Sequence, residues 1–198
     1  MISSKLKFVF IHIPKTGGNS LQWYLRECSD HQISRRRNGM GPNDGLDVVG
    51  INKHQVKYKT DFFKFCIVRN PYDRALSWYF FNNPRIKTYD KNSFINFIKK
   101  LNTEEHSQYR YLDDPTIHKI HFENMIEELK ELDIFKNTKY TFEEYPRLNS
   151  SVNFKYNWEE IYDQETRDIV YEKFHKDFEV CGYNRLGQLS IRIAPRPP

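Results

Sequence analysis

The stretch from Phe8 to Tyr24, FVFIHIPKTGGNSLQWY, decides the fold. Its first residues, Phe8 to Ile11, are apolar and predict a buried strand, which ends before Pro14 because proline has no N–H group for a sheet. A loop of small and polar residues follows, and an apolar pattern typical of a helix begins at Leu21. This order of strand, glycine-containing loop and helix binds phosphate in many proteins, because glycine lets the backbone approach an anion.

Lysine stands before the two glycines of this loop. In the common phosphate-binding pattern, G-x-x-x-x-G-K-[ST], lysine follows the last glycine, whereas here Lys15 precedes Gly17 and Gly18. The loop therefore predicts an anion site of another kind, to which Lys15 and the hydroxyl groups of Thr16 and Ser20 add charge and donors. Taken alone, the loop leaves open a glycine-rich turn without function.

A second anion motif follows the clearest strand of the chain, residues 64–68. Arg69 stands at the end of this strand, and Asn70 and Pro71 are typical N-cap and first residues of a helix predicted over 71–81. Ser77 lies eight positions after Arg69 (77 − 69 = 8), within that helix. Both side chains could therefore face one anion near the carboxyl ends of the strands, where open α/β sheets bind ligands. The alternative is that Arg69 pairs with the nearby Asp73.

The two motifs together resemble those of the sulfotransferases, whose donor is 3′-phosphoadenosine 5′-phosphosulfate (PAPS). PKTGGNS is similar to their 5′-phosphosulfate loop, and VRNPYDRALSWY is similar to their 3′-phosphate motif. More narrowly, HIPKTGGNSL resembles the glycan sulfotransferases related to heparan sulfate 2-O-sulfotransferase. IHFENMIEELKEL, LNSSVNF and DQETRDIVYEKFHKDFEVCGY extend the resemblance over most of residues 8–183, although 29–47 and 89–114 do not match.

The resemblance implies a role for each matched residue. Lys15 would contact the phosphosulfate and stabilise the leaving phosphate, and His54, in NKHQVKY, would accept the proton of the acceptor hydroxyl. Two positions depart from the family pattern: Asn19 replaces the usual threonine, and Asn52 replaces the first histidine of the segment around His54, which could then be a surface or capping residue. The residues implied to bind PAPS are Lys15, Thr16, Gly17, Gly18, Asn19, Ser20, Arg69, Ser77, Ser150 and Ser151.

The composition suits one domain with a core rich in aromatic side chains. The chain has 198 residues, of which 16% are aromatic, and its formal net charge of +5 favours an anionic ligand. We expect a single domain over residues 1–185 and a loose tail over 186–198. Three scattered cysteines argue against a disulfide framework, Cys66 reads as a core thiol, and no spacing of metal ligands occurs.

The apolar runs and the N-terminal residues indicate where in the cell the protein is expected to work. No apolar run approaches the roughly 20 residues that span a bilayer, and the first residues lack the pattern of a signal peptide. The sequence thus predicts a cytoplasmic enzyme if the chain is complete, or else a catalytic domain cut from an enzyme of the Golgi lumen. It does not indicate an oligomeric state.

Strands that alternate with helices predict an α/β fold, with three layers and a central parallel sheet flanked by helices, as in P-loop proteins. Strands are expected at 8–11, 48–51, 64–68 and 117–122, and helices at 19–28, 71–81, from Ser93 to 101, 123–132 and 163–178.

These observations predict a sulfotransferase that moves a sulfuryl group from PAPS to a hydroxyl group of a carbohydrate, without a metal. A P-loop kinase is the first alternative, but it would need lysine after the last glycine and an aspartate for Mg²⁺. The second alternative, a non-catalytic binder of nucleic acid or another polyanion, leaves the spacing of Arg69 and Ser77 unexplained.

Overall fold

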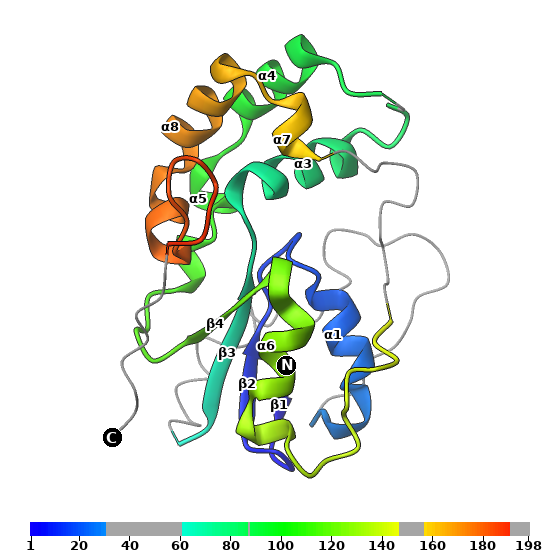
Figure 1. The fold of residues 1–198 in the computed structure, drawn as a ribbon. Helices are drawn as coiled ribbons and strands as arrows, with labels where there is room; N and C mark the ends of the chain where they lie inside the picture. The colour runs from blue at the N-terminus through cyan, green and yellow to red at the C-terminus, as the bar shows by residue number, and fades with distance from the viewer. Residues whose placement is uncertain (31–60, 87, 147–156, 191–198) are drawn as a thin grey trace. The chain divides into compact units, whose positions relative to one another are not determined.

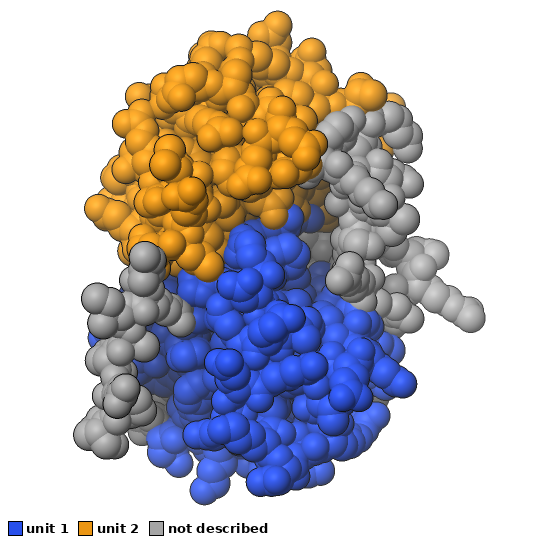
Figure 2. Space-filling model, in the orientation of Figure 1, with its two compact units in different colours: residues 1–69, 111–152 blue, residues 70–110, 153–198 orange. Residues whose placement is uncertain are grey.

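The computed structural model describes residues 1–30, 61–86, 88–146 and 157–190. These residues form two compact units, which Figure 2 colours separately: the first comprises residues 1–69 and 111–152, and the second residues 70–110 and 153–198. The first unit contains the sheet, and the second is built from helices (Figure 1).

The sheet of the first unit has four described strands in the order β1-β2-β3-β4. β2 (Phe8–Ile11), β3 (Phe63–Val68) and β4 (His118–His121) are parallel, and Phe10 pairs with Phe65 while Val68 pairs with His121. This confirms three predicted strands, whereas the strand expected at 48–51 lies outside the described residues. β1 (Ile2–Ser3) was not predicted, and it pairs antiparallel with β2.

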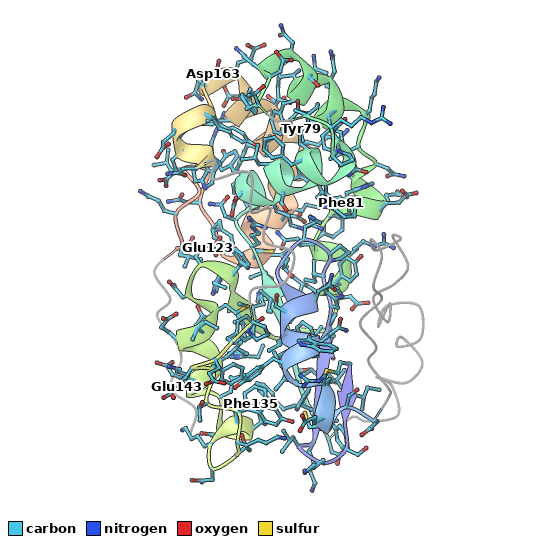
Figure 3. The ribbon with its side chains drawn as sticks, turned by 90° about the vertical axis from the view of Figure 1, so that its right-hand side faces the viewer. Tyr79, Phe81, Glu123, Phe135, Glu143 and Asp163 are labelled. Atoms are coloured by element: carbon cyan, nitrogen blue, oxygen red, sulfur yellow. The ribbon has the colours of Figure 1, made fainter. Side chains whose placement is uncertain are left out.

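One face of the sheet carries the main core of the first unit. Phe8, Phe10 and Phe65 are fully buried there, together with side chains from α1 (Gly18–Tyr24) and α6 (Met125–Glu131). Figure 3 shows Phe135 in this unit, and its ring meets the rings of Phe8 at 5.8 Å and Phe65 at 6.2 Å. The described part of this unit also contains the 3₁₀ turns η1 (Arg26–Cys28), η3 (Phe122–Asn124) and η4 (Asp133–Phe135).

The alternate residues of the strands are buried as well. Val9, Cys66 and Val68 have no exposed surface, and burial raises the pKa of the Cys66 thiol to about 12, as expected for a core cysteine. Strands that bury both faces are typical of a parallel sheet in an α/β protein. The chain therefore has an α/β fold, while the three-layer arrangement of P-loop proteins stays a prediction.

The second unit packs its helices around a long C-terminal one. α8 (Gln164–Cys181) contacts α3 (Pro71–Asn82) and α4 (Lys91–Lys100), and α7 (Trp158–Ile161) packs on α3. Tyr79 of α3, labelled in Figure 3, is fully buried against the ring of Phe94. The short helix α5 (Thr103–His106) and the turn η2 (Tyr109–Tyr111) lie between α4 and β4 in the chain.

Side chains cap the helices of this unit at their N-termini. Asn70 accepts a hydrogen bond from the Tyr72 N–H at 2.8 Å, as its position before Pro71 predicts. The prediction that Ser93 caps the next helix was wrong: Asp90 caps α4, and the Ser93 N–H donates to its carboxylate at 2.7 Å. The sequence around the start of α4 offers three residues with capping chemistry, Asp90, Asn92 and Ser93, and the helix begins after the first of them.

The chain remains hydrogen-bonded beyond residue 185, where the loose tail was expected to begin. The Asn184 N–H donates to the Gln188 carbonyl, and the Ser190 N–H donates to the Gly182 carbonyl, both at 2.8 Å. Gly187 lies against Trp158, where a Cβ atom would come within 2.7 Å of the indole ring. Described residues up to Ser190 thus take part in the hydrogen bonding of the second unit, and the division into a domain and a tail stays a prediction. None of the helices within the described ranges combines the length and the apolar composition that a membrane span requires.

Candidate functional site

Three chain segments leave the sheet at the same edge. β2, β3 and β4 are parallel neighbours, so their carboxyl ends meet at one side of the first unit. The loop after β2 carries Lys15, Arg69 follows β3, and Phe122 follows β4 directly. This edge is where open α/β sheets bind ligands.

The loop after β2 makes a tight turn whose backbone enters the left-handed region twice. Lys15 has φ 69° and Gly17, the N-cap of α1, has φ 82°. The Ser20 N–H donates to the Gly17 carbonyl at 3.1 Å, which closes the first turn of the helix. The helix begins at Gly18, one residue earlier than expected.

The side chains of this loop have different environments. Thr16 is fully buried, and its hydroxyl donates to the Ile13 carbonyl at 2.8 Å, so that a contact between Thr16 and an anion would come from its backbone N–H. Ser20 is also buried, and Lys15 and Asn19 are half-buried. The Thr16 hydroxyl thus stabilises the loop by this hydrogen bond, whereas the sequence predicts that it donates to the anion.

Both glycines lie against rings. A Cβ atom at Gly17 would come within 2.9 Å of the Phe122 ring, and one at Gly18 would come within 2.4 Å of the His12 ring. Contacts below 3.0 Å are essentially never seen for a Cβ atom, so only glycine fits at these two positions as the structure stands. Glycine is therefore required here by the packing of these rings against the backbone, and neither residue adds a side chain of its own to the loop.

Arg69 touches the same loop. Its Nη1 donates to the Lys15 carbonyl at 3.1 Å, and its guanidinium lies 4.3 Å from the centre of the Phe122 ring. An arginine over an aromatic face gains a cation–π attraction, which fixes the orientation of the guanidinium. Two motifs that lie 54 residues apart in the sequence are therefore in contact within the first unit.

The other predicted site residues are not brought together by the described structure. Ser77 lies on α3 in the second unit and is half-buried, so its pairing with Arg69 on one phosphate stays a prediction. His54, Ser150 and Ser151 lie outside the described residues, and their roles stay predictions too.

The sequence analysis missed Phe122 and His12. Phe122 supports Arg69 and borders Gly17, and His12 borders Gly18. A signal was present for both. His12 directly follows β2 and Phe122 directly follows β4, and both strands are neighbours of β3, which is followed by the predicted site residue Arg69. Identifying them required the order of the strands, which no single motif contains.

The buried histidine next to Phe122 has a structural partner. His121 is the last residue of β4, its N–H donates to Glu128 of α6 at 3.0 Å, and its Nδ1 lies 3.1 Å from the same carboxylate. This pair ties α6 to the sheet beneath the site. Among the described residues, no group of three or more His, Cys, Asp or Glu side chains could hold a metal ion.

Comparison with known proteins identifies the chain. The model of the sulfotransferase family matches residues 1–184. No curated protein and no solved structure gave a match. The family match covers the loop after β2, Arg69 and Phe122 alike, and it favours sulfuryl transfer over the phosphoryl transfer of a kinase and over binding without catalysis. The chain belongs to the sulfotransferase family, and it is an enzyme that transfers sulfuryl groups.

Proposed function

We propose that the sulfuryl donor is PAPS and that the acceptor is a hydroxyl group of a carbohydrate. The donor carries an anion at each end of its ribose, so it needs two groups of positive charge and N–H donors. The observation that carries the proposal is the contact of Arg69 with the Lys15 carbonyl, because it joins the loop that resembles a phosphosulfate loop to the arginine of the motif that resembles a 3′-phosphate motif.

The residues of the loop fit the phosphosulfate end. Gly17 and Gly18 add no side chain of their own to the loop, and the backbone of residues 16–20 would cradle the anion at the start of α1. The ammonium group of Lys15 would neutralise the charge that develops on the leaving phosphate. Arg69, oriented by the ring of Phe122, together with Ser77 would bind the 3′-phosphate.

The reaction is a displacement at sulfur. The acceptor oxygen forms a bond to sulfur, the bond between sulfur and the 5′-phosphate oxygen breaks, and the product nucleotide leaves with that electron pair. The hydroxyl proton passes to a base, for which His54 is the candidate, and Ser150 and Ser151 would close over the nucleotide. Positioning and positive charge supply the catalysis, and this set of residues needs no metal.

The choice of a carbohydrate acceptor rests on the resemblance of HIPKTGGNSL to the glycan sulfotransferases. A screen of sugar acceptors with radiolabelled PAPS tests it directly. Transfer to a non-carbohydrate hydroxyl alone would contradict the acceptor while leaving the donor in place.

Binding of the product nucleotide, 3′-phosphoadenosine 5′-phosphate (PAP), tests the donor. At about 100 times Kd, a ligand adds roughly 2.7 kcal/mol to the free energy of unfolding, which corresponds to a rise in Tm of roughly 5–10 °C for a chain of this size. We expect this rise with PAP in the absence of Mg²⁺, and a much smaller one with ATP, which lacks the 3′-phosphate. A larger, Mg²⁺-dependent shift with ATP in the same thermal-unfolding assay would refute the proposal.

A further inference from the structure

His12 stands between the end of β2 and the phosphosulfate loop, and its ring occupies the space beside Gly18. A Cβ atom at residue 18 would lie 2.4 Å from His12 Cδ2 and 2.9 Å from Nε2. The imidazole lies nearly parallel to the Phe10 ring, with 6.2 Å between the ring centroids and 21° between the planes. The same Cβ atom would also lie 3.1 Å from Phe10 Cζ. His12 thus lies between the Phe10 ring of the core and the start of α1.

The first turn of α1 is held from two sides. His12 borders Gly18, and the Phe122 ring borders Gly17 at a distance that leaves no room for a side chain. Gly17 has its φ angle at 82°, and its carbonyl accepts the Ser20 N–H at 3.1 Å. A short turn with a left-handed residue has several competing conformations, and contacts on both of its glycines select one of them.

His12 acts there as an uncharged ring. Burial, as the main cause, lowers the pKa of His12 to about 4, so the imidazole is neutral at physiological pH. A neutral ring packed against glycine can hold the backbone in one conformation, but it supplies no charge to an anion.

We infer that His12 is a positioning residue of the sulfuryl-donor site, because its ring fills the space beside Gly18 and holds residues 17–20 in the conformation that receives the 5′-phosphosulfate. This role rests on the proposed function, since it assumes that the loop binds the 5′ anion of PAPS. It is a role in shaping the loop, and it assigns no proton transfer to His12.

Calorimetric titration of His12 variants tests the inference with two nucleotides that differ only at the 5′ position. We expect His12→Ala to raise the Kd of PAP about tenfold, the equivalent of one weakened charged hydrogen bond, and to change the Kd of adenosine 3′-monophosphate by less than about twofold. His12→Phe keeps a flat ring and should retain the affinity for PAP within about threefold. The matched control is His118→Ala, since His118 also lies beside a phenylalanine ring of the sheet, Phe63 at 5.6 Å, but at the start of β4.

A pair of compensating variants sharpens the test. Gly18→Ala should weaken PAP binding because its methyl group collides with His12. Combining it with His12→Ala removes the ring from that space, so the double variant should bind PAP more tightly than Gly18→Ala alone. Independent, additive losses would contradict a steric contact between the two positions.

Amide hydrogen exchange without ligand separates the inference from the proposed function. In His12→Ala, the Ser20 N–H should exchange faster than in the wild type, whereas His118→Ala should leave it unchanged. Unchanged exchange in His12→Ala, or equal losses of affinity for PAP and adenosine 3′-monophosphate, would overturn the positioning role. A wild-type protein that fails to bind PAP would instead refute the proposed function, and hydrogen exchange would still decide whether His12 holds the loop.

Discussion

At the scale of single residues, the backbone of Lys15 links the loop after β2 to Arg69, the two parts of the proposed donor site. Its φ angle of 69° lies in the left-handed region, which costs a residue with a side chain roughly 1–2 kcal/mol relative to a helical conformation. This conformation is accompanied by a contact, because the Lys15 carbonyl accepts the hydrogen bond of Arg69 at 3.1 Å. A glycine would relieve the strain but would remove the ammonium group that the proposed chemistry needs.

Arg69 has two partners in the proposed complex, the 3′-phosphate and the Lys15 carbonyl. Arg69→Ala should therefore weaken PAP binding by roughly 1.5–3 kcal/mol, the scale of hydrogen bonds to charged groups. The loss should be smaller, but not zero, for adenosine 5′-phosphosulfate, which lacks the 3′-phosphate but still uses the loop that Arg69 contacts. Calorimetric titration of both ligands measures the difference.

The control for Arg69→Ala is Arg26→Ala. It removes the same charge from a guanidinium that lies over the Trp23 ring at 4.4 Å, after the end of α1. We expect little change in the affinity for either nucleotide. Equal losses for both ligands in Arg69→Ala would mean that Arg69 does not bind the 3′-phosphate.

The depressed pKa of His12 makes a prediction for stability. In the unfolded chain, histidine titrates near 6.5, whereas burial lowers the pKa of His12 in the folded chain to about 4. Between these two values the unfolded state binds the extra proton, so the contribution of the neutral His12 is fully present above pH 6.5 and is lost as the pH falls toward 4. We expect the free energy of unfolding of the wild type, relative to His12→Phe, to fall by about 1–3 kcal/mol over that range. Urea unfolding at a series of pH values measures this difference, and parallel curves for the two proteins would contradict it.

At the scale of elements, the start of α3 depends on one amide side chain. Asn70 is buried, its oxygen accepts the Tyr72 N–H at 2.8 Å, and its Nδ2 donates to the Gly187 carbonyl at 2.8 Å. Asn70→Ala should lower the free energy of unfolding by about 2–3 kcal/mol, because it removes a helix cap and also leaves a carbonyl without this donor. Asn70→Asp keeps the cap but places a carboxylate oxygen against the Gly187 carbonyl, so its cost should come from the lost donor and not from the cap.

Asn102→Ala provides the comparison for this cap. Asn102 accepts the Glu104 N–H at 2.9 Å at the start of α5, but it is exposed. Its loss should therefore cost about 1 kcal/mol or less. Urea unfolding of the three variants gives the ranking, and an Asn70→Ala effect no larger than that of Asn102→Ala would show that the contact with Gly187 contributes nothing.

The elements that could be predicted are those whose signal is local. β3 and α3 follow from an apolar run and from the sequence Asn70-Pro71, and the loop after β2 follows from its glycines. β1 has only two residues and no pattern of its own, because it exists through its pairing with Phe8 and Val9. In the same way, no local signal tells that Phe122 supports Arg69, since that contact depends on the order of the strands.

At the scale of the whole molecule, the 3′-phosphate motif is divided between the two compact units. Arg69 is the last residue of the first segment of one unit, and Asn70 begins the other, which also contains Ser77. The phosphosulfate loop belongs entirely to the first unit. The 5′ and 3′ ends of the proposed donor therefore depend on different residues of the chain. Ligands that carry only one of the two anions can separate these contributions to binding.

Hydrogen exchange with three ligands tests whether Arg69 and Ser77 bind the same phosphate. Adenosine 5′-phosphosulfate should slow the exchange of amides in residues 15–20 and leave those of α3 nearly unchanged. PAP should slow both sets, because a bond from Ser77 to the 3′-phosphate stabilises α3, and adenosine 3′-monophosphate should slow mainly the amides of α3. In Ser77→Ala, the effect of PAP on α3 should shrink while its effect on the loop remains. If PAP slows exchange in the loop alone, in the wild type as in the variant, Ser77 takes no part in nucleotide binding, and the 3′-phosphate must be held by Arg69 with other partners.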